Sequence, residues 1–180
     1  MIFTELAIPG VYLVELEQRT DERGFFARTF CTAEFEAHGL APSMPQANIS
    51  YNHVAGTLRG MHMQIAPHEE AKLIRCVRGA IRDVIVDMRP ESATFLRNVG
   101  VDLHQDGRTA LYVPEGFAHG YQTLMDSTEV HYPVSEAHAP GFERGYRYDD
   151  PSFGIEWPVP VTCISEKDAG WPLRDSQMEG

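Results

Sequence analysis

The chain has 180 residues, of which 43% are hydrophobic and 23% charged, as in an ordinary folded domain. Its net charge of −11 argues against nucleic acid or an acidic membrane as a partner, because such binding needs excess Lys and Arg to neutralise phosphates. No run of 18 apolar residues and no basic-then-apolar leader is present, so we expect one cytoplasmic domain over residues 1–180, without a membrane span or signal peptide.

The cysteines do not form a recognisable framework. The chain has an odd number of cysteines, namely Cys31, Cys76 and Cys163. They lie far apart and lack CxxC spacing. This pattern favours neither disulfides nor a structural zinc site. We therefore expect reduced cysteines that pack within the fold.

The first part of the chain combines strand, turn and helix signals. Residues 8–17 open with a turn and then alternate apolar and polar positions, as a half-buried strand does. Residues 19–30 contain a turn before an aromatic pair. Residues 32–38 have a short helical pattern, with Thr32 as the predicted N-cap and Gly39 as the predicted left-handed residue that ends the helix.

From residue 46 onward, short β-type runs alternate with turn residues. The predicted strands are 46–51, 60–64, 72–77, 80–88, 96–103, 109–113, 119–124, 129–134 and 145–148. Because no helix of about 10 to 15 residues separates them, the pattern predicts an all-β antiparallel sandwich or barrel rather than an α/β fold. We expect the tail from about residue 157 to be irregular.

A stretch beginning GTLRGMH draws together residues that could carry chemistry. It places Arg59, His62, Gln64 and Lys72 in or beside strands, and alternation puts His62 and Gln64 on one face with Met63 on the other. A histidine with cations in one short span fits a site for a small anionic substrate. The alternative is that a lone histidine in a strand only packs and forms a hydrogen bond.

Four roles can be assigned on chemical grounds. His62 is the best candidate base, since an imidazole is easily poised near neutral pH. Tyr132 could be an acid on the opposite face, and Asp168 could orient the imidazole. Lys72 and Arg59 could stabilise an enolate or bind phosphate. Each also has a purely structural interpretation: a core aromatic, a surface turn residue or a solvated strand residue.

A metal-dependent cupin is the main chemical alternative. Cupin barrels bind metal through an H-x-H pair, a carboxylate and a later histidine, and the GFAHG element at 116–120 stands where that histidine belongs. Here Gln64 replaces the second histidine of the pair, and an amide is a poor ligand for a transition metal. We therefore expect no metal and no cofactor.

The sequence resembles the dTDP-4-dehydrorhamnose 3,5-epimerase family of cupin-like barrels over residues 10–168. The motifs that carry the resemblance are DERGFF (21–26), GTLRGMH (56–62), KLIRCVRGAIRDVIVDMR (72–89), VPEGFAHGYQTL (113–124) and ISEKD (164–168). The resemblance implies a homodimeric, metal-free jelly roll with a few short helices. It also implies a nucleotide-diphosphate-linked 4-keto-6-deoxyhexose as substrate, in a pathway that supplies deoxysugars.

The resemblance further implies a role for each matched residue. His62 would remove the proton next to the ketone with Asp168 as its partner, Tyr132 would return a proton from the other face, and Lys72 would stabilise the enolate oxygen. The ketone acidifies carbons 3 and 5, so a base and an acid on opposite faces can invert them. The residues implied to bind substrate are Arg23, Gln46, Asn48, Arg59, His119, Glu143 and Lys167.

Two further candidate substrate contacts depart from the family pattern. Arg28 stands where the family usually has Glu, and His138 stands where it has a Tyr that stacks on thymine. An arginine offers no acceptor to the thymine N–H, whereas cytosine presents acceptors at that edge, so a CDP-linked sugar is an alternative to the dTDP-linked one. If Arg28 instead faces solvent, the ordinary dTDP sugar remains the substrate. Two more functions fit the same residues: a mono-epimerase, and a non-catalytic binder of nucleotide sugars.

Overall fold

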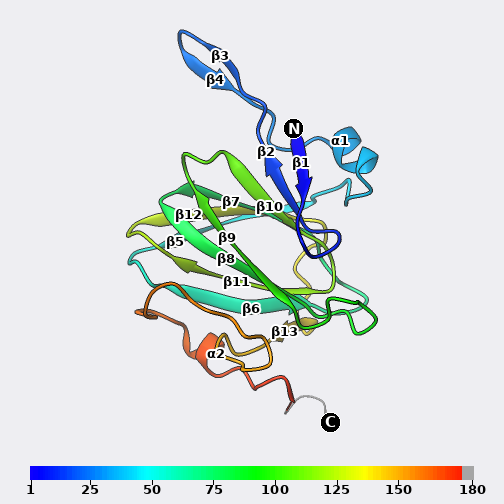
Figure 1. The fold of residues 1–180 in the computed structure, drawn as a ribbon, viewed down its shortest axis with the longest axis vertical. Coiled ribbons are helices and arrows are strands. Elements are labelled where there is room, and N and C mark those ends of the chain that lie inside the picture. Colours follow the sequence, from blue (N-terminus) through cyan, green and yellow to red (C-terminus); the bar gives the residue numbers. More distant parts are fainter. Residues whose placement is uncertain (176–180) are drawn as a thin grey trace.

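The computed structural model describes residues 1–175, and Figure 1 shows two antiparallel sheets packed face to face. One sheet has the strand order β1 (Ile2–Glu5), β2 (Tyr12–Glu15), β10 (Thr109–Val113), β7 (Lys72–Arg78), β12 (Thr128–Val134) and β5 (Gln46–Asn52). The other has the order β13 (Glu143–Gly145), β6 (Leu58–Gln64), β11 (Phe117–Thr123), β8 (Ala80–Asp87) and β9 (Asn98–His104). A separate hairpin pairs β3 (Arg19–Asp21) with β4 (Gly24–Phe26), and the helices are α1 (Thr32–Ala37) and α2 (Glu166–Ala169). The all-β expectation is therefore confirmed.

Some local predictions were wrong in detail. The turn and strand expected at residues 8–17 are present as the turn before β2 and β2 itself, but β1 was not predicted, and the last expected strand lies at 143–145 rather than 145–148. The N-cap of α1 is Cys31, because the Thr32 hydroxyl donates instead to the Pro42 carbonyl at 2.9 Å. Gly39 does adopt the expected left-handed backbone, with φ of 69°.

Apolar side chains fill the space between the sheets away from the site. Ile74, Ile85 and Leu111 are completely buried there, each pointing inward from its strand as the period-two alternation requires. The outer face of the six-stranded sheet is covered by α1, whose Phe35 is also fully buried. Truncating Phe35 to alanine should cost about 3–5 kcal/mol of stability, the usual range for a buried aromatic.

The C-terminal tail covers the outer face of the five-stranded sheet and then returns to the edge of β6. Phe153 packs there against Met61 and Val84. A backbone hydrogen bond of 2.8 Å from Leu58 N–H to the Cys163 carbonyl then fixes the tail beside β6. Figure 1 shows α2 next to β13 and β6, so a segment expected to be irregular contains a helical turn at the site.

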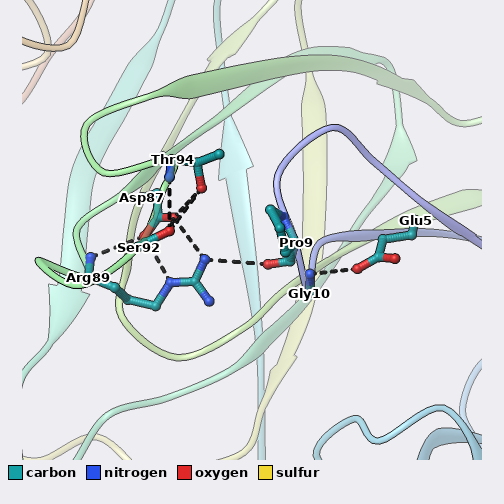
Figure 2. A network of polar contacts seen from close by, with 7 residues as sticks. All are labelled: Glu5, Pro9, Gly10, Asp87, Arg89, Ser92 and Thr94. Carbon is teal, nitrogen blue, oxygen red and sulfur yellow. Dashed lines mark hydrogen bonds and ion pairs between the residues drawn. The ribbon is translucent and has the colours of Figure 1, made fainter.

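A polar network fixes the loop that follows β8 (Figure 2). Asp87 is fully buried and accepts hydrogen bonds from Arg89, Ser92 and Thr94 at 2.6–2.8 Å. Burial alone would raise the pKa of Asp87, but these donors outweigh burial and lower the pKa. Arg89 also donates to the Pro9 carbonyl at 3.4 Å, which connects this loop to the β1–β2 turn.

Within residues 1–175, no helix is long and apolar enough to cross a membrane. The three cysteines are all free thiols.

Candidate active site

A cavity of about 330 Å³ opens between the two sheets. Strands β6, β11 and β13 form one wall, and β5, β7 and β12 form the other. The cavity is lined by ten of the predicted catalytic and substrate-binding residues: Gln46, Asn48, Arg59, His62, Lys72, His119, Tyr132, His138, Glu143 and Lys167. The structure thus brings together residues from sequence positions 46 to 167.

His62 and Asp168 form a dyad at this cavity. His62 Nε2 lies 2.6 Å from Asp168 Oδ1, and the Gly60 backbone N–H donates to Oδ2 at 3.2 Å. The Asp168 side chain is almost completely buried, whereas the His62 ring remains partly open to the cavity. Burial alone would raise the pKa of Asp168, but the hydrogen bonds from His62 and Gly60 outweigh it and lower the pKa. The carboxylate is therefore ionised and positioned to orient the imidazole.

The local fold of α2 explains how Asp168 reaches this position. The Ser165 side chain caps the helix by accepting from the Asp168 backbone N–H at 3.0 Å. Because Leu58 also binds the chain at Cys163, both ends of the segment before Asp168 are fixed. The sequence signal for this turn is a serine three residues before an acidic residue.

Arg59 and His62 share the cavity because of a β-bulge. The two residues are three positions apart, so strict alternation would send them to opposite faces. His62 pairs with His119 while Arg59 pairs with Tyr121, so three steps along β6 match two along β11. This register shift turns both side chains into the cavity. Alternation alone could not predict that arrangement.

The opposite wall presents a phenol and an ammonium group. Tyr132 on β12 and Lys72 on β7 both face the cavity. Burial raises the pKa of Tyr132, so its phenol keeps its proton through neutral pH. Lys72 donates to Glu70, and both side chains are nearly buried, at 9% and 13% exposure. Glu70 belongs to no motif that points to the site, although it lies two residues before the candidate lysine.

Amide and imidazole groups line further parts of the cavity. Gln46 donates to Asn48 at 3.0 Å and accepts the His138 backbone N–H at 3.1 Å. On the opposite wall, His119 Nε2 lies 3.0 Å from a carboxylate oxygen of Asp83, which is fully buried. Asp83 therefore fixes the ring of His119. The available signal for Asp83 was an acid inside the largely apolar run of 80–86, and it was not among the predicted site residues.

Cations outnumber acids around the cavity. Lys167 donates to Glu143 at 2.9 Å, and Arg59 donates to Asn52 at 2.8 Å. The lining has four cationic side chains (Arg59, Lys72, Arg144 and Lys167) and two acidic ones (Glu70 and Glu143). A local positive excess of this kind can hold a diphosphate on a protein with a net charge of −11.

Two predicted contacts lie away from this chain's own cavity. Arg23 is at the tip of the β3–β4 hairpin, which projects from the barrel in Figure 1, and its guanidinium donates to Asp21. Arg28 follows the hairpin and donates to Glu34 at 2.7 Å. Neither is among the described residues that line the cavity.

Gln64 is held in a structural role. Its amide nitrogen donates to the His68 carbonyl at 3.0 Å, and its oxygen accepts the Ala139 N–H at 2.7 Å. These bonds hold two loops together and leave the amide committed to backbone groups. Over residues 1–175, no three side chains of His, Cys, Asp or Glu gather into an arrangement that could hold a metal ion.

Comparisons with known proteins agree with this geometry. A family model described as dTDP-4-dehydrorhamnose 3,5-epimerase matches residues 5–175. The chain is 41% identical over 180 residues to the dTDP-4-dehydrorhamnose 3,5-epimerase of Methanothermobacter thermautotrophicus, covering 98% of this chain and 96% of that one. It is 37% identical to the dTDP-4-dehydrorhamnose 3-epimerase of Streptomyces niveus, covering 91% and 79% of the two chains.

A solved structure shows the same fold. The dTDP-4-dehydrorhamnose 3,5-epimerase from Bacillus anthracis, crystallised with TDP and PPi bound, superposes with a TM-score of 0.92 at 39% identity, covering 96% of this chain and 98% of that one. The fold and cavity therefore define a cupin-type jelly roll with a histidine–carboxylate dyad. Within that class, the chain belongs to the dTDP-4-dehydrorhamnose 3,5-epimerase family. The resemblance drawn from the sequence motifs is confirmed.

Proposed function

We propose that this enzyme inverts carbons 3 and 5 of a dTDP-linked 4-keto-6-deoxyhexose. The observation that carries the proposal is the His62–Asp168 pair, which faces a cavity whose opposite wall presents Tyr132. His62 removes the proton next to the ketone, and the ionised Asp168 stabilises the imidazolium that forms. Family membership supports both the reaction and the nucleotide.

Two groups on the β7–β12 side complete the proposed reaction. Lys72 stabilises the enolate oxygen that develops at carbon 4, since an ammonium group in a partly dry cavity interacts strongly with such charge. Tyr132, protonated at neutral pH, returns a proton on the face away from His62. Removal on one face and return on the other inverts the carbon, and no redox step is involved. The polar and cationic lining is proposed to bind the sugar and diphosphate: Gln46, Asn48, Arg59, His119, His138, Glu143 and Lys167.

The nucleotide is proposed to be dTDP rather than CDP. The CDP alternative required Arg28 to be free to meet a pyrimidine edge. Its guanidinium is instead paired with Glu34 in the same chain. This pairing, together with the dTDP sugar named for the relatives, supports dTDP over CDP.

A mono-epimerase is the second candidate function, favoured by the 37% identity to a relative named as a 3-epimerase. Incubation with dTDP-4-dehydro-6-deoxyglucose in heavy water, followed by NMR of the product, separates the two. Inversion with deuterium at carbons 3 and 5 supports the proposed function, and deuterium at carbon 3 alone supports the mono-epimerase. An unchanged substrate without deuterium contradicts both.

We also propose that the working unit is a homodimer in which the β3–β4 hairpin reaches the partner. The hairpin projects from the barrel and carries Phe26, 71% exposed, and Phe25, 44% exposed, a large apolar surface for an arm in water. Arg23 at its tip would add a cation to the partner's cavity. The free thiols support a reducing, cytoplasmic location, and we propose that residues 1–180 act as one domain.

Mixing two inactive variants tests the arm. In a dimer of Arg23→Ala with His62→Ala, one site carries both defects and the other carries neither. Random mixing should therefore restore activity to about a quarter of the wild-type level. If mixing restores no activity although mass spectrometry shows mixed dimers, the arm does not complete the partner's site.

A further inference from the structure

Trp171 lies beside the dyad and has no assigned role. It follows α2 by two residues and lines the cavity next to Lys167, whose Nζ lies 5.5 Å from the centre of the indole ring. The ring packs against Gly145 of β13, the residue that pairs in register with His62. The indole is thus placed between the edge strand and the dyad.

The fit against Gly145 fixes the position of the ring. A Cβ added at Gly145 would lie 2.0 Å from the Trp171 ring, a distance that no side chain can accept. Gly145 does not adopt a left-handed backbone, so turn geometry does not explain the glycine here. The indole occupies the space that a side chain at position 145 would fill.

The indole nitrogen is the unusual group in this arrangement. Nε1 is buried, and among residues 1–175 it meets no acceptor within normal hydrogen-bonding geometry. A buried N–H without a partner is destabilising, so native proteins rarely retain one without a reason. The nitrogen nonetheless lies near enough to the Asp168 carboxylate to contribute to lowering its pKa, after the larger effects of burial, His62 and Gly60.

We propose that Trp171 is a positioning residue of the dyad, whose indole N–H becomes a third donor to Asp168 when substrate fills the cavity. The inference rests on the proposed function, in which Asp168 orients His62. His62 and Gly60 already bind one carboxylate oxygen each, and carboxylates have lone pairs for further donors. Hydrogen bonds of this kind are often long in an empty site and shorten in the complex.

Phenylalanine at position 171 tests the inference, because it keeps an aromatic ring and removes only the N–H. We expect Trp171→Phe to lower kcat about tenfold, the usual effect of losing one charge-assisted hydrogen bond, with a smaller change in KM. Gly145→Ala should lower kcat in the same direction by displacing the indole. The matched control is Trp157→Phe, because Trp157 donates to the Tyr148 carbonyl at 3.0 Å outside the site.

A second readout does not depend on turnover. The chain has two tryptophans, so its NMR spectrum contains two indole N–H resonances, which the two Phe variants assign. Addition of dTDP and an unreactive sugar analogue should change the chemical shift of the Trp171 N–H. This change should differ between Asp168→Asn and the wild type, whereas the change at the Trp157 N–H should be the same in both.

The inference would be overturned if Trp171→Phe had the same kcat as the wild type. It would also be overturned if only KM increased, because the ring would then contribute to substrate binding alone. A Trp171 resonance that is indifferent to Asp168→Asn would also overturn it. Failure of the wild-type enzyme to epimerise would instead defeat the proposed function, so the two failures are distinguishable.

Discussion

His62 on β6 and Asp168 in α2 are 106 positions apart in the chain and lie 2.6 Å apart in space. The contact depends on the tail crossing the outer face of the five-stranded sheet and returning to β6, where Cys163 accepts the Leu58 N–H. The proposed catalytic base and its orienting group therefore come from distant parts of the chain. Changes in the tail should affect catalysis as directly as changes in the barrel.

Asp168→Asn should lower kcat about 100-fold or more, because the imidazolium formed during proton removal loses its counter-charge. The asparagine is nearly the same size, so KM should change little by comparison. Steady-state kinetics measure the effect. Glu166→Gln makes the same change in charge on the exposed side of the same helical turn and should leave kcat near wild type. Equal losses in both variants would assign the effect to helix stability.

Glu70→Gln should lower kcat about tenfold, because Lys72 loses the carboxylate that holds its ammonium group toward the cavity. Binding of dTDP alone should be nearly unaffected, since this pair lies on the wall with Tyr132. Measuring kcat and the Kd for dTDP in the wild type and in Glu70→Gln separates an effect on catalysis from an effect on binding. Glu69→Gln provides the control one residue earlier. Unchanged kcat in Glu70→Gln would mean that Lys72 needs no positioning partner.

Calorimetry should show that dTDP binds about tenfold or more tightly than CDP, the scale expected from one unpaired polar group at the base. Arg28→Ala should leave this ratio unchanged, because the guanidinium is already paired with Glu34. A preference for CDP that disappears in Arg28→Ala would restore the cytosine hypothesis.

Asp87→Asn should destabilise the fold by about 2–4 kcal/mol at pH 7, because three donors lose a buried anionic partner. The pKa of Asp87 is lowered in the folded state, so its stabilisation is complete above the unfolded-state pKa of about 4 and is lost as the pH falls toward the folded-state pKa. The difference in free energy of unfolding between Asp87→Asn and the wild type should therefore become smaller at acidic pH.

Urea denaturation at pH 7 and pH 3 measures the change in stability. Asp102→Asn is the control, since its pair with Arg82 is 56% exposed on the Asp102 side and should contribute under about 1 kcal/mol. Equal stability of Asp87→Asn and the wild type at pH 7 would contradict the role given to the network.

The sequence alone predicted the all-β class and most strand positions, because alternation and turn residues are local signals. It also placed His62, Tyr132 and Lys72 at a common site through the family motifs. Geometry set by tertiary structure was not predictable. The bulge that turns Arg59 beside His62 is a register effect between strands, and α2 depends on packing against β6.

Further site residues were missed for a similar reason. Glu70 and Asp83 each contact another side chain of the site, and Trp171 is proposed to do so in the complex. Nothing in the sequence next to these residues indicates which side chain that is. Arg23 and Arg28 were grouped with the site by motif, yet in one chain they lie outside the cavity. Whether Arg23 serves a second copy is a question of assembly that alternation and spacing do not address.

Deuterium exchange in heavy water by His62→Ala and Tyr132→Phe tests the central claim most directly. In the wild type, deuterium should enter the dTDP-linked 4-keto sugar at the inverted carbons. The account predicts that His62→Ala abolishes exchange at both carbons, whereas Tyr132→Phe keeps some exchange and loses most inversion. Exchange at the wild-type rate in His62→Ala would contradict the assignment of the base and the mechanism built on it.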